Sequence, residues 1–225
     1  MAASGAGQAG ALEVVLATHN AHKVAEFQRI LGERMPGITV LPYDGPSPVE
    51  DGTSFAANAL IKARAAAAHT GRIALADDSG IAVDVMGGAP GIFSARWAGH
   101  AAGDVENVKL LLAQLGDVRR PNRGAAFHCT IAVVVPAALA GAASAGEPAD
   151  EEFVAEGLWR GALAYEPRGS HGFGYDPVFE PEGYEVTAAE LLPEQKNAIS
   201  HRARAFEALI PELERIAERV GAAAE

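Results

Sequence analysis

Two adjacent carboxylates, Asp77 and Asp78, offer the clearest potential for chemistry in the chain. They follow an apolar run of strand length that begins at Ile73, and a Ser-Gly pair and a second apolar run, Ile81 to Val85, come after them. Successive side chains of a strand point to opposite faces, so both acids cannot enter the core without an unpaired buried charge. We therefore expect them at a strand end, although Asp-Ser-Gly is also ordinary turn chemistry.

A polar segment suited to an anion follows the first predicted strand, Leu12 to Ala17. Thr18 begins this segment, Asn20 is suited to cap the amphipathic helix that follows, and Lys23 lies in the first turn of that helix. Free N–H groups at a helix N-terminus together with a lysine can hold an anion, but an ordinary helix cap explains the pattern equally well. No Gly-x4-Gly-Lys-Ser/Thr phosphate loop occurs in the chain.

A second cluster of functional residue types extends from Gly169 to Arg204. Its first part, through Phe179, mixes glycines with aromatic residues, which suits a loop that stacks a planar base while backbone groups bind the base edge. A tight turn with core aromatics is the alternative. Lys196, His201 and Arg202 gather hydrogen-bond donors near the last helix. Ser200 is the predicted cap of this helix, and its later apolar residues are spaced to form one long apolar stripe. Solvated side chains would explain these donors too.

Composition limits the classes of function. A chain of 225 residues with 49% hydrophobic residues is long enough to bury the core of one globular domain. The net charge of −11 argues against binding to nucleic acid or to an anionic membrane surface. The single cysteine, Cys129, excludes an intramolecular disulfide, and we expect an inert buried thiol there. We see no signal peptide or transmembrane helix and expect a cytoplasmic protein.

Periodicity and turn signals place the remaining elements. Gly5, Gly7 and Gly10 have Gly-x-Gly-x-x-Gly spacing, but they precede the first strand, so residues 1–11 are expected to be a flexible tail. Residues 137–150 are low in complexity and are expected to be a flexible loop. The other predicted elements are strands at Ile38 to Leu41, Ala125 to Val135 and Glu152 to Leu158, and helices at Thr53 to Ala68 and Val105 to Leu115.

The motifs together resemble the family of inosine-triphosphate pyrophosphatases, which clear non-standard purine nucleoside triphosphates. The matching segments are Thr-x-Asn-x-x-Lys from Thr18, Ala-Asp-Asp-Ser-Gly from Ala76, the Gly-Gly-Ala-Pro-Gly run from Gly87, Phe-Gly-Tyr-Asp from Phe173, and Lys196 with Ser-His-Arg. The resemblance spans Leu12 to about Leu209. It implies an α/β fold in which helices flank a long mixed β-sheet in two lobes with a nucleotide cleft between them. Residues 12–222 would form this single domain, usually as a homodimer.

The resemblance also implies a reaction, the Mg²⁺-dependent hydrolysis of ITP, dITP and XTP to the monophosphate and pyrophosphate. Asp78 would be a metal ligand and the general base, Glu50 a second metal ligand, and Asp77 a supporting acid. The chain departs from the family pattern at Ala57, where an acid is usual. Substrate binding is implied for Thr18, His19, Asn20, Lys23, Lys62, Ser79, Phe173, Gly174, Tyr175, Asp176, Lys196, His201 and Arg202.

Two alternatives remain open at the level of sequence. One is a non-catalytic nucleotide sensor, which would have no need for the metal-binding carboxylates. The other is a pyrophosphatase for modified pyrimidine nucleotides. If Lys196, His201 and Arg202 read the base, their donors favour the 6-carbonyl of hypoxanthine and xanthine over the 6-amino group of adenine.

Overall fold

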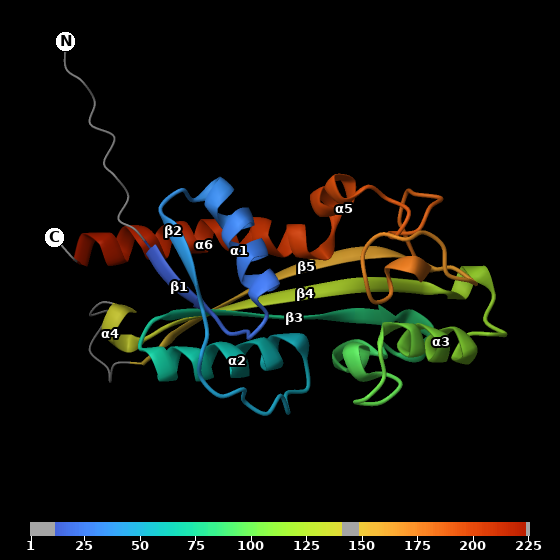
Figure 1. Ribbon diagram of the computed structural model, residues 1–225, viewed down its shortest axis with the longest axis horizontal. Helices are drawn as coiled ribbons and strands as arrows, with labels where there is room; N and C mark the ends of the chain where they lie inside the picture. Colours follow the sequence, from blue (N-terminus) through green and yellow to red (C-terminus); the bar gives the residue numbers. More distant parts are fainter. Residues whose placement is uncertain (1–11, 141–148, 224–225) are drawn as a thin grey trace, which may run out of the picture.

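A six-stranded mixed sheet forms the centre of the protein in the computed structural model, which describes residues 12–140 and 149–223 (Figure 1). The strand order is β2-β1-β3-β4-β5-β6; β1 runs parallel to β2 and β3, and the other neighbours are antiparallel. The α/β fold with a mixed sheet is thus confirmed. The strands are β1 (Leu12–Leu16), β2 (Ile38–Pro42), β3 (Ile73–Val83), β4 (Gly124–Val135), β5 (Glu151–Leu163) and β6 (Phe179–Pro181).

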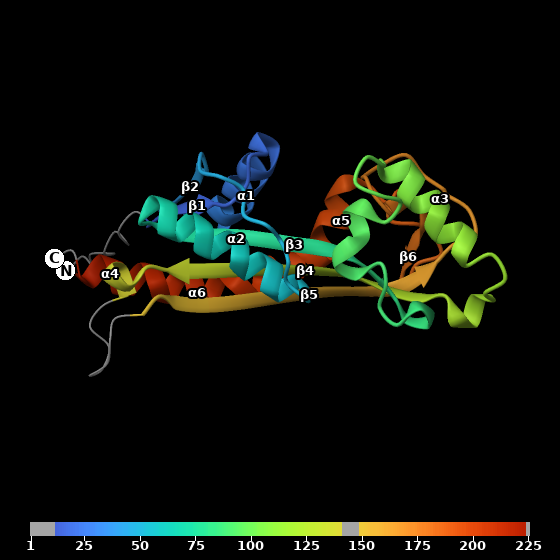
Figure 2. The ribbon, with the colours of Figure 1, turned by 90° about the horizontal axis from the view of Figure 1, so that it is seen from below.

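Helices cover both faces of the sheet. α1 and α6 lie on one face and α2 lies on the other (Figure 1). The long strands β3, β4 and β5 continue beyond these helices to the opposite end of the molecule, where α3, α5 and β6 lie (Figure 2). The helices are α1 (Ala21–Arg34), α2 (Phe55–Thr70), α3 (Asp104–Gln114), α4 (Ala137–Ala140), α5 (Pro193–Ile199) and α6 (His201–Ala223).

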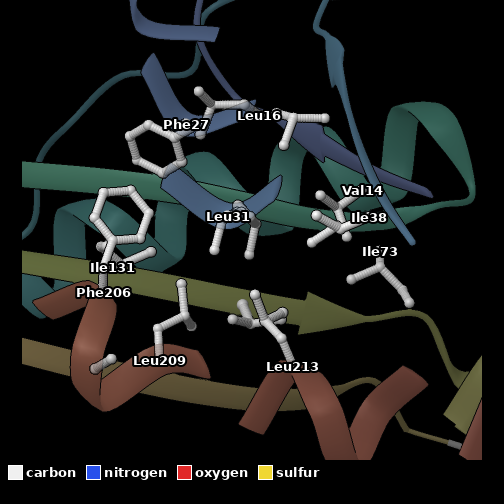
Figure 3. Close-up of a cluster of buried hydrophobic side chains, with 14 of the residues drawn as sticks. Val14, Leu16, Phe27, Leu31, Ile38, Ile73, Ile131, Phe206, Leu209 and Leu213 are labelled. Atoms are coloured by element: carbon white, nitrogen blue, oxygen red, sulfur yellow. The ribbon is translucent and has the colours of Figure 1, made fainter. Parts of the chain in front are cut away.

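Side-chain size decides how the helices pack. The predicted apolar stripe of α6 is confirmed: Phe206, Leu209 and Leu213 are buried against α1 and the sheet (Figure 3). Phe27 of α1 meets Phe206 edge to face at 4.7 Å between ring centroids. On the other face, α2 presents mainly alanines to alanines of β3, and such small side chains allow a close approach.

The expectation that a strand ends at Asp77 and Asp78 is wrong, because β3 continues through both residues. Its pairing with β4 is unbroken from Ala74 to Val83. The two acids alternate across the sheet, so Asp77 faces α1 and α6 while Asp78 faces α2, and each meets a lysine. These counter-charges come from distant parts of the chain, and they remove the unpaired charge that argued against a strand.

The acids do lie beside the end of a strand, but that strand is β1. Leu16 of β1 pairs with Leu75 of β3, after which the chain leaves the sheet toward α1. Because β3 continues past this point, Asp77 and Asp78 lie at the edge where the parallel strand β1 stops. Ligands of open α/β sheets bind outside the carboxyl ends of strands, so this edge is a natural place for a site.

Other sequence expectations have mixed outcomes. Asn20 caps α1 as predicted, because its side chain accepts hydrogen bonds from His22 and Lys23. The last helical region is divided at Ser200, so Lys196 belongs to α5 and only His201 and later residues belong to α6. Ala137–Ala140 is helical where a loop was expected, and residues 1–11 and 141–148 lie outside the described residues. No described helix has both the length and the apolar character required to cross a membrane.

Candidate active site

A cavity of about 290 Å³ lies at the carboxyl end of β1. The turn from β1 into α1 supplies part of its wall, β3 supplies another part, and the segment between β2 and α2 closes it. The lining residues include both cations and acids: Thr18, His19, Lys23, Glu50, Lys62 and Asp77. The structure therefore brings together predicted site residues from four separate parts of the sequence.

Asp77 is held by a buried ion pair. Its Oδ1 lies 2.6 Å from Nζ of Lys23, and the Asp77 side chain is only 4% exposed. Burial raises the pKa of Asp77, but the charges of Lys23 and Arg202 outweigh burial and lower that pKa overall. Asp77 is thus a carboxylate that holds Lys23 and lies in the field of Arg202, while its buried Oδ2 has no hydrogen-bond partner.

Asp78 lies on the opposite face of β3 and shares a lysine with Glu50. Nζ of Lys62 lies 3.0 Å from Glu50 Oε2 and 3.5 Å from Asp78 Oδ1. Burial is the main cause that raises the pKa of Asp78; Lys62 opposes it and Glu50 reinforces it. A raised carboxyl pKa favours acceptance of a proton, as a general base requires. Oδ2 of Asp78 is buried without a hydrogen-bond partner.

Asn58 supports this pair, and sequence reasoning gave it no role. The side chain is 2% exposed, its Oδ1 accepts a hydrogen bond from Gly52 N–H at 2.9 Å, and its amide also lowers the pKa of Asp78. One signal could have found it: Asn58 is a polar residue in an alanine-rich helix, four positions before Lys62 and so on the same helix face.

The turn between β1 and α1 is built by its own side chains. Thr18 Oγ1 accepts the Asn20 N–H at 3.2 Å, and Asn20 Oδ1 in turn caps the helix. His19 is 2.9 Å from the Gly45 carbonyl oxygen through Nε2 and 3.3 Å from Ser47 Oγ through Nδ1. His19 therefore joins this turn to the segment before α2, so it shapes the cavity as well as lining it.

A second cavity, of about 340 Å³, is bordered by aromatic and polar groups. The predicted residues Ser79, Phe173, Gly174, Tyr175, Asp176, Lys196, His201 and Arg202 all line it. The Phe173 side chain is 65% exposed, and Nζ of Lys196 lies 5.3 Å from the ring centroid. An exposed ring beside a cation is suited to stack on a planar, polar ligand.

Several residues of the Phe-Gly-Tyr-Asp motif hold the loop rather than face outward. Asp176 is buried, accepts the Phe173 N–H at 2.8 Å and binds Lys196. The Tyr175 hydroxyl donates to the Ser94 carbonyl oxygen at 2.8 Å. Gly174 has a φ of +61°, a conformation that favours glycine, and its N–H donates to Asp104 of α3 at 2.8 Å.

His201 and Arg202 project from the start of α6 with different electrostatics. Burial is the main cause that lowers the pKa of His201 to about 3, so its imidazole is neutral, and it stacks on Phe127 at 4.8 Å. Arg202 Nη1 lies 3.1 Å from both carboxylate oxygens of Glu26. Sequence reasoning missed Glu26, although it follows Lys23 by three positions on α1 and therefore shares its face.

The two cavities adjoin through shared elements. Lys23 and Glu26 come from one face of α1, and Asp77 and Ser79 come from one face of β3. One cavity offers cations and carboxylates, and the other offers an exposed ring and buried donors. The site as a whole therefore suits an elongated ligand with an anionic end and a planar end.

Comparison with known proteins assigns the chain to a family. The model of the Ham1 family matches residues 14–212. The chain belongs to the Ham1 family. It is 58% identical over 90% of its length to a dITP/XTP pyrophosphatase of Leifsonia xyli subsp. xyli, 96% of which is covered. It is 48% identical over 88% of its length to a dITP/XTP pyrophosphatase of Streptomyces avermitilis, 95% of which is covered.

Solved Ham1 structures share the architecture. A HAM1 protein from Coxiella burnetii superposes with a TM-score of 0.79 at 43% identity, covering 91% of this chain and 99% of that one. A nucleoside-triphosphatase / dITP/XTP pyrophosphatase from Mycobacterium abscessus gives a TM-score of 0.73 at 45% identity, with 89% and 100% covered. The resemblance inferred from the motifs is thereby confirmed.

The two carboxylates of this site suit magnesium better than a metal ion that is coordinated entirely by protein side chains. Among the residues that the structure describes, no group of three or more His, Cys, Asp and Glu side chains is arranged to hold a metal ion. Glu50 and Asp78 supply two carboxylates, and Oδ2 of Asp78 is unpartnered. Magnesium is commonly held by one or two carboxylates together with substrate phosphates and water, so these residues fit it.

Proposed function

We propose that this Ham1-family protein hydrolyses non-standard purine nucleoside triphosphates (ITP, dITP and XTP) to the nucleoside monophosphate and pyrophosphate. The observation that carries the proposal is the meeting of two acids, Glu50 and Asp78, with two lysines, Lys23 and Lys62, at the end of β1. A non-catalytic sensor would need the lysines and the ring of Phe173 but not the paired acids. Removal of such nucleotides keeps them out of DNA and RNA.

Each residue has a definite task in this reaction. Lys23, Lys62 and the Thr18 turn would hold the phosphates and offset the charge that develops on the leaving pyrophosphate. Asp78 would accept the proton of the water that attacks the α-phosphorus as the bond to the bridging oxygen breaks. Asp77 would hold Lys23 in position, and Glu26 would hold Arg202. Glu50 and Asp78 would hold Mg²⁺, which when bound supplies positive charge to the phosphate oxygens.

Base recognition would use the other cavity. Phe173 would stack on the purine, and Lys196 and Arg202 would donate hydrogen bonds to acceptors such as the 6-carbonyl. Arg202→Ala should then lower kcat/KM for ITP far more than for ATP, because adenine offers a donor at position 6. Equal losses for both nucleotides would show that Arg202 binds phosphate or sugar instead.

A product assay tests the central proposal. The protein is incubated with ITP and Mg²⁺, and the products are separated. Inosine monophosphate and pyrophosphate are expected. Orthophosphate would indicate another phosphatase, and unchanged ITP with measurable binding would indicate a sensor. Parallel incubations with modified pyrimidine triphosphates test the remaining alternative.

The quaternary structure and cell compartment are further parts of this proposal. We expect a homodimer that acts in the cytoplasm on the free nucleotide pool, without nucleic-acid or membrane partners. The net charge of −11 supports the last point, because a strongly acidic chain repels other polyanions. Light scattering at micromolar concentration should give the mass of a dimer, and a monomer would contradict this part alone.

A further inference from the structure

One lysine occupies the position between the two carboxylates proposed to hold the metal. Nζ of Lys62 is 3.0 Å from Glu50 and 3.5 Å from Asp78, and its side chain is 16% exposed. The other lysine of this cavity, Lys23, is engaged by Asp77 at 2.6 Å. Lys62 therefore supplies an ammonium that contacts both Glu50 and Asp78, and it offsets part of their charge.

An ammonium group and a divalent cation cannot both occupy this position. A bound Mg²⁺ ligates carboxylate oxygens at about 2.0–2.1 Å. Lys62 lies within hydrogen-bonding distance of the same two carboxylates, so a cation there would lie close to its positive charge. Lys62 also has a flexible four-carbon stem, which lets its ammonium move while its helix stays in place.

We propose that Lys62 is an internal counter-cation, which holds Glu50 and Asp78 together in the metal-free protein and gives way when a divalent cation enters. Its ammonium then turns to the phosphates that arrive with the cation. This inference rests on the proposed use of Glu50 and Asp78 as metal ligands. Its consequence is that Lys62 opposes binding of the metal alone and favours binding of metal and nucleotide together.

The surrounding structure can keep the carboxylates in place when Lys62 leaves. Asn58 of the same helix holds the Gly52 N–H at 2.9 Å, which fixes the segment that carries Glu50. Asp78 is fixed by the pairing of β3 with β4, in which it lies opposite Thr130. The exchange of partners therefore needs a movement of one side chain and not of the backbone.

Metal binding without nucleotide tests the inference directly. The probe is Mn²⁺, titrated into the nucleotide-free protein and followed by the electron paramagnetic resonance of the free ion. Lys62→Met keeps an unbranched side chain of similar length and removes its charge, so it should bind Mn²⁺ at least tenfold more tightly than the wild type. Arg64→Met is the matched control, because Arg64 lies on the same helix but pairs with Glu152 away from the cavity. It should leave Mn²⁺ affinity unchanged.

A second variant should shift Mn²⁺ affinity in the opposite direction. Lys62→Arg keeps the charge and can engage carboxylates with two nitrogens, so it should bind Mn²⁺ more weakly than the wild type. With a non-hydrolysable triphosphate analogue present, the advantage of Lys62→Met over the wild type should disappear. Equal or weaker Mn²⁺ binding by Lys62→Met would overturn the inference, as would tighter binding by Lys62→Arg.

The counter-cation role of Lys62 and the proposed reaction can fail independently of each other. If the wild type fails to hydrolyse ITP but the two variants shift Mn²⁺ affinity in opposite directions, the proposed reaction is wrong and the counter-cation stands. If ITP is hydrolysed and Mn²⁺ affinity does not respond to Lys62, the reaction stands and the counter-cation is wrong.

Discussion

The two cavities of the site are held in place by different kinds of contact. At the end of β1, charged side chains hold one another, as in the Lys23–Asp77 pair at 2.6 Å and the Lys62–Glu50 pair at 3.0 Å. Around Phe173, the loop is held mainly through its backbone, and the ring itself is 65% exposed. The charged groups of the first cavity thus hold one another, whereas the Phe173 ring of the second is an exposed side chain on a backbone that Asp104 and the Lys196-paired Asp176 hold in place.

This difference predicts different costs of mutation. Removal of one member of a buried ion pair leaves the other charged and desolvated, so a change in the first cavity should affect both chemistry and stability. Removal of an exposed ring from a loop held by its backbone should affect only the binding of the ligand.

Asp78→Asn should have the largest effect. The variant keeps the shape of the side chain but cannot accept a proton or ligate a cation with a full charge, so kcat for ITP should fall by about 10³-fold or more. Circular dichroism should show an intact fold. Asp44→Asn is the control, because the Asp44 side chain is 93% exposed, and it should retain activity. Full activity in Asp78→Asn would remove Asp78 from the mechanism.

Asp77→Asn should mainly destabilise the protein. It leaves Lys23 without its buried partner and removes a carboxylate charge near Arg202, at a cost of about 3 kcal/mol in the free energy of unfolding. Denaturant unfolding measures this loss. The control is Glu33→Gln, which removes an exposed pair with Arg29 at 3.3 Å and should change stability by less than about 0.5 kcal/mol. Similar losses in both variants would contradict the importance of burial.

The same variant has a pH signature. The folded-state pKa of Asp77 lies below the ordinary value of 3.8, so its contribution to stability is present above that value and is lost as the pH falls through the folded pKa. The stability advantage of the wild type over Asp77→Asn should therefore be constant from pH 5 to 8 and decline in strong acid. A stability advantage of the wild type that grew in acid would contradict the lowered pKa of Asp77.

The sequence predicts most of the elements because their signals are local. The apolar stripe of α6 and the Asn20 cap need only neighbouring residues, and both are present in the structure. The continuity of β3 through Asp77 and Asp78 could not be predicted in this way. It depends on Lys23 and Lys62, which lie 54 and 16 positions before Asp77 and Asp78 and approach them only in the folded chain.

The site was predicted more from motif resemblance than from chemistry. The residues of the two cavities come from many separate segments between Ala17 and Arg202, and no periodicity relates Phe173 to Lys23. The groups that the motifs do not contain were missed for the same reason. Glu26 and Asp104 act through partners at positions 202 and 174, which lie far along the chain and cannot be identified from local sequence.

Burial of His201 should make the stability of the protein depend on pH. Burial lowers its pKa from 6.5 to about 3, so below pH 6.5 the unfolded chain binds a proton that the folded protein does not. This group should therefore lower the free energy of unfolding by about 2 kcal/mol between pH 7 and pH 5. Denaturant unfolding at the two pH values should show this loss in the wild type, and His201→Asn should lack it.

An exposed histidine provides the comparison for this effect. His100 is exposed, so His100→Asn should keep the full acid-dependent loss of the wild type. If His201→Asn and His100→Asn changed the pH dependence equally, His201 would not be the group responsible. His201 should also contribute no change in the KM for ITP from pH 6 to pH 8, because its imidazole is neutral throughout that range.

Phe173→Ala should have the smallest effect and complete the contrast between the cavities. Stacking of an aromatic ring on a base contributes about 1–3 kcal/mol, so the KM for ITP should rise by about tenfold while kcat stays close to the wild-type value. The melting temperature should not change, because the ring is 65% exposed and the loop is held by Asp176 and Asp104 through backbone N–H groups. Tyr184→Ala is the matched control, since Tyr184 is 43% exposed and does not line this cavity. A fall in kcat at unchanged KM would instead show that Phe173 orients the reacting phosphate, and the separation between a charged end and a base end would not hold.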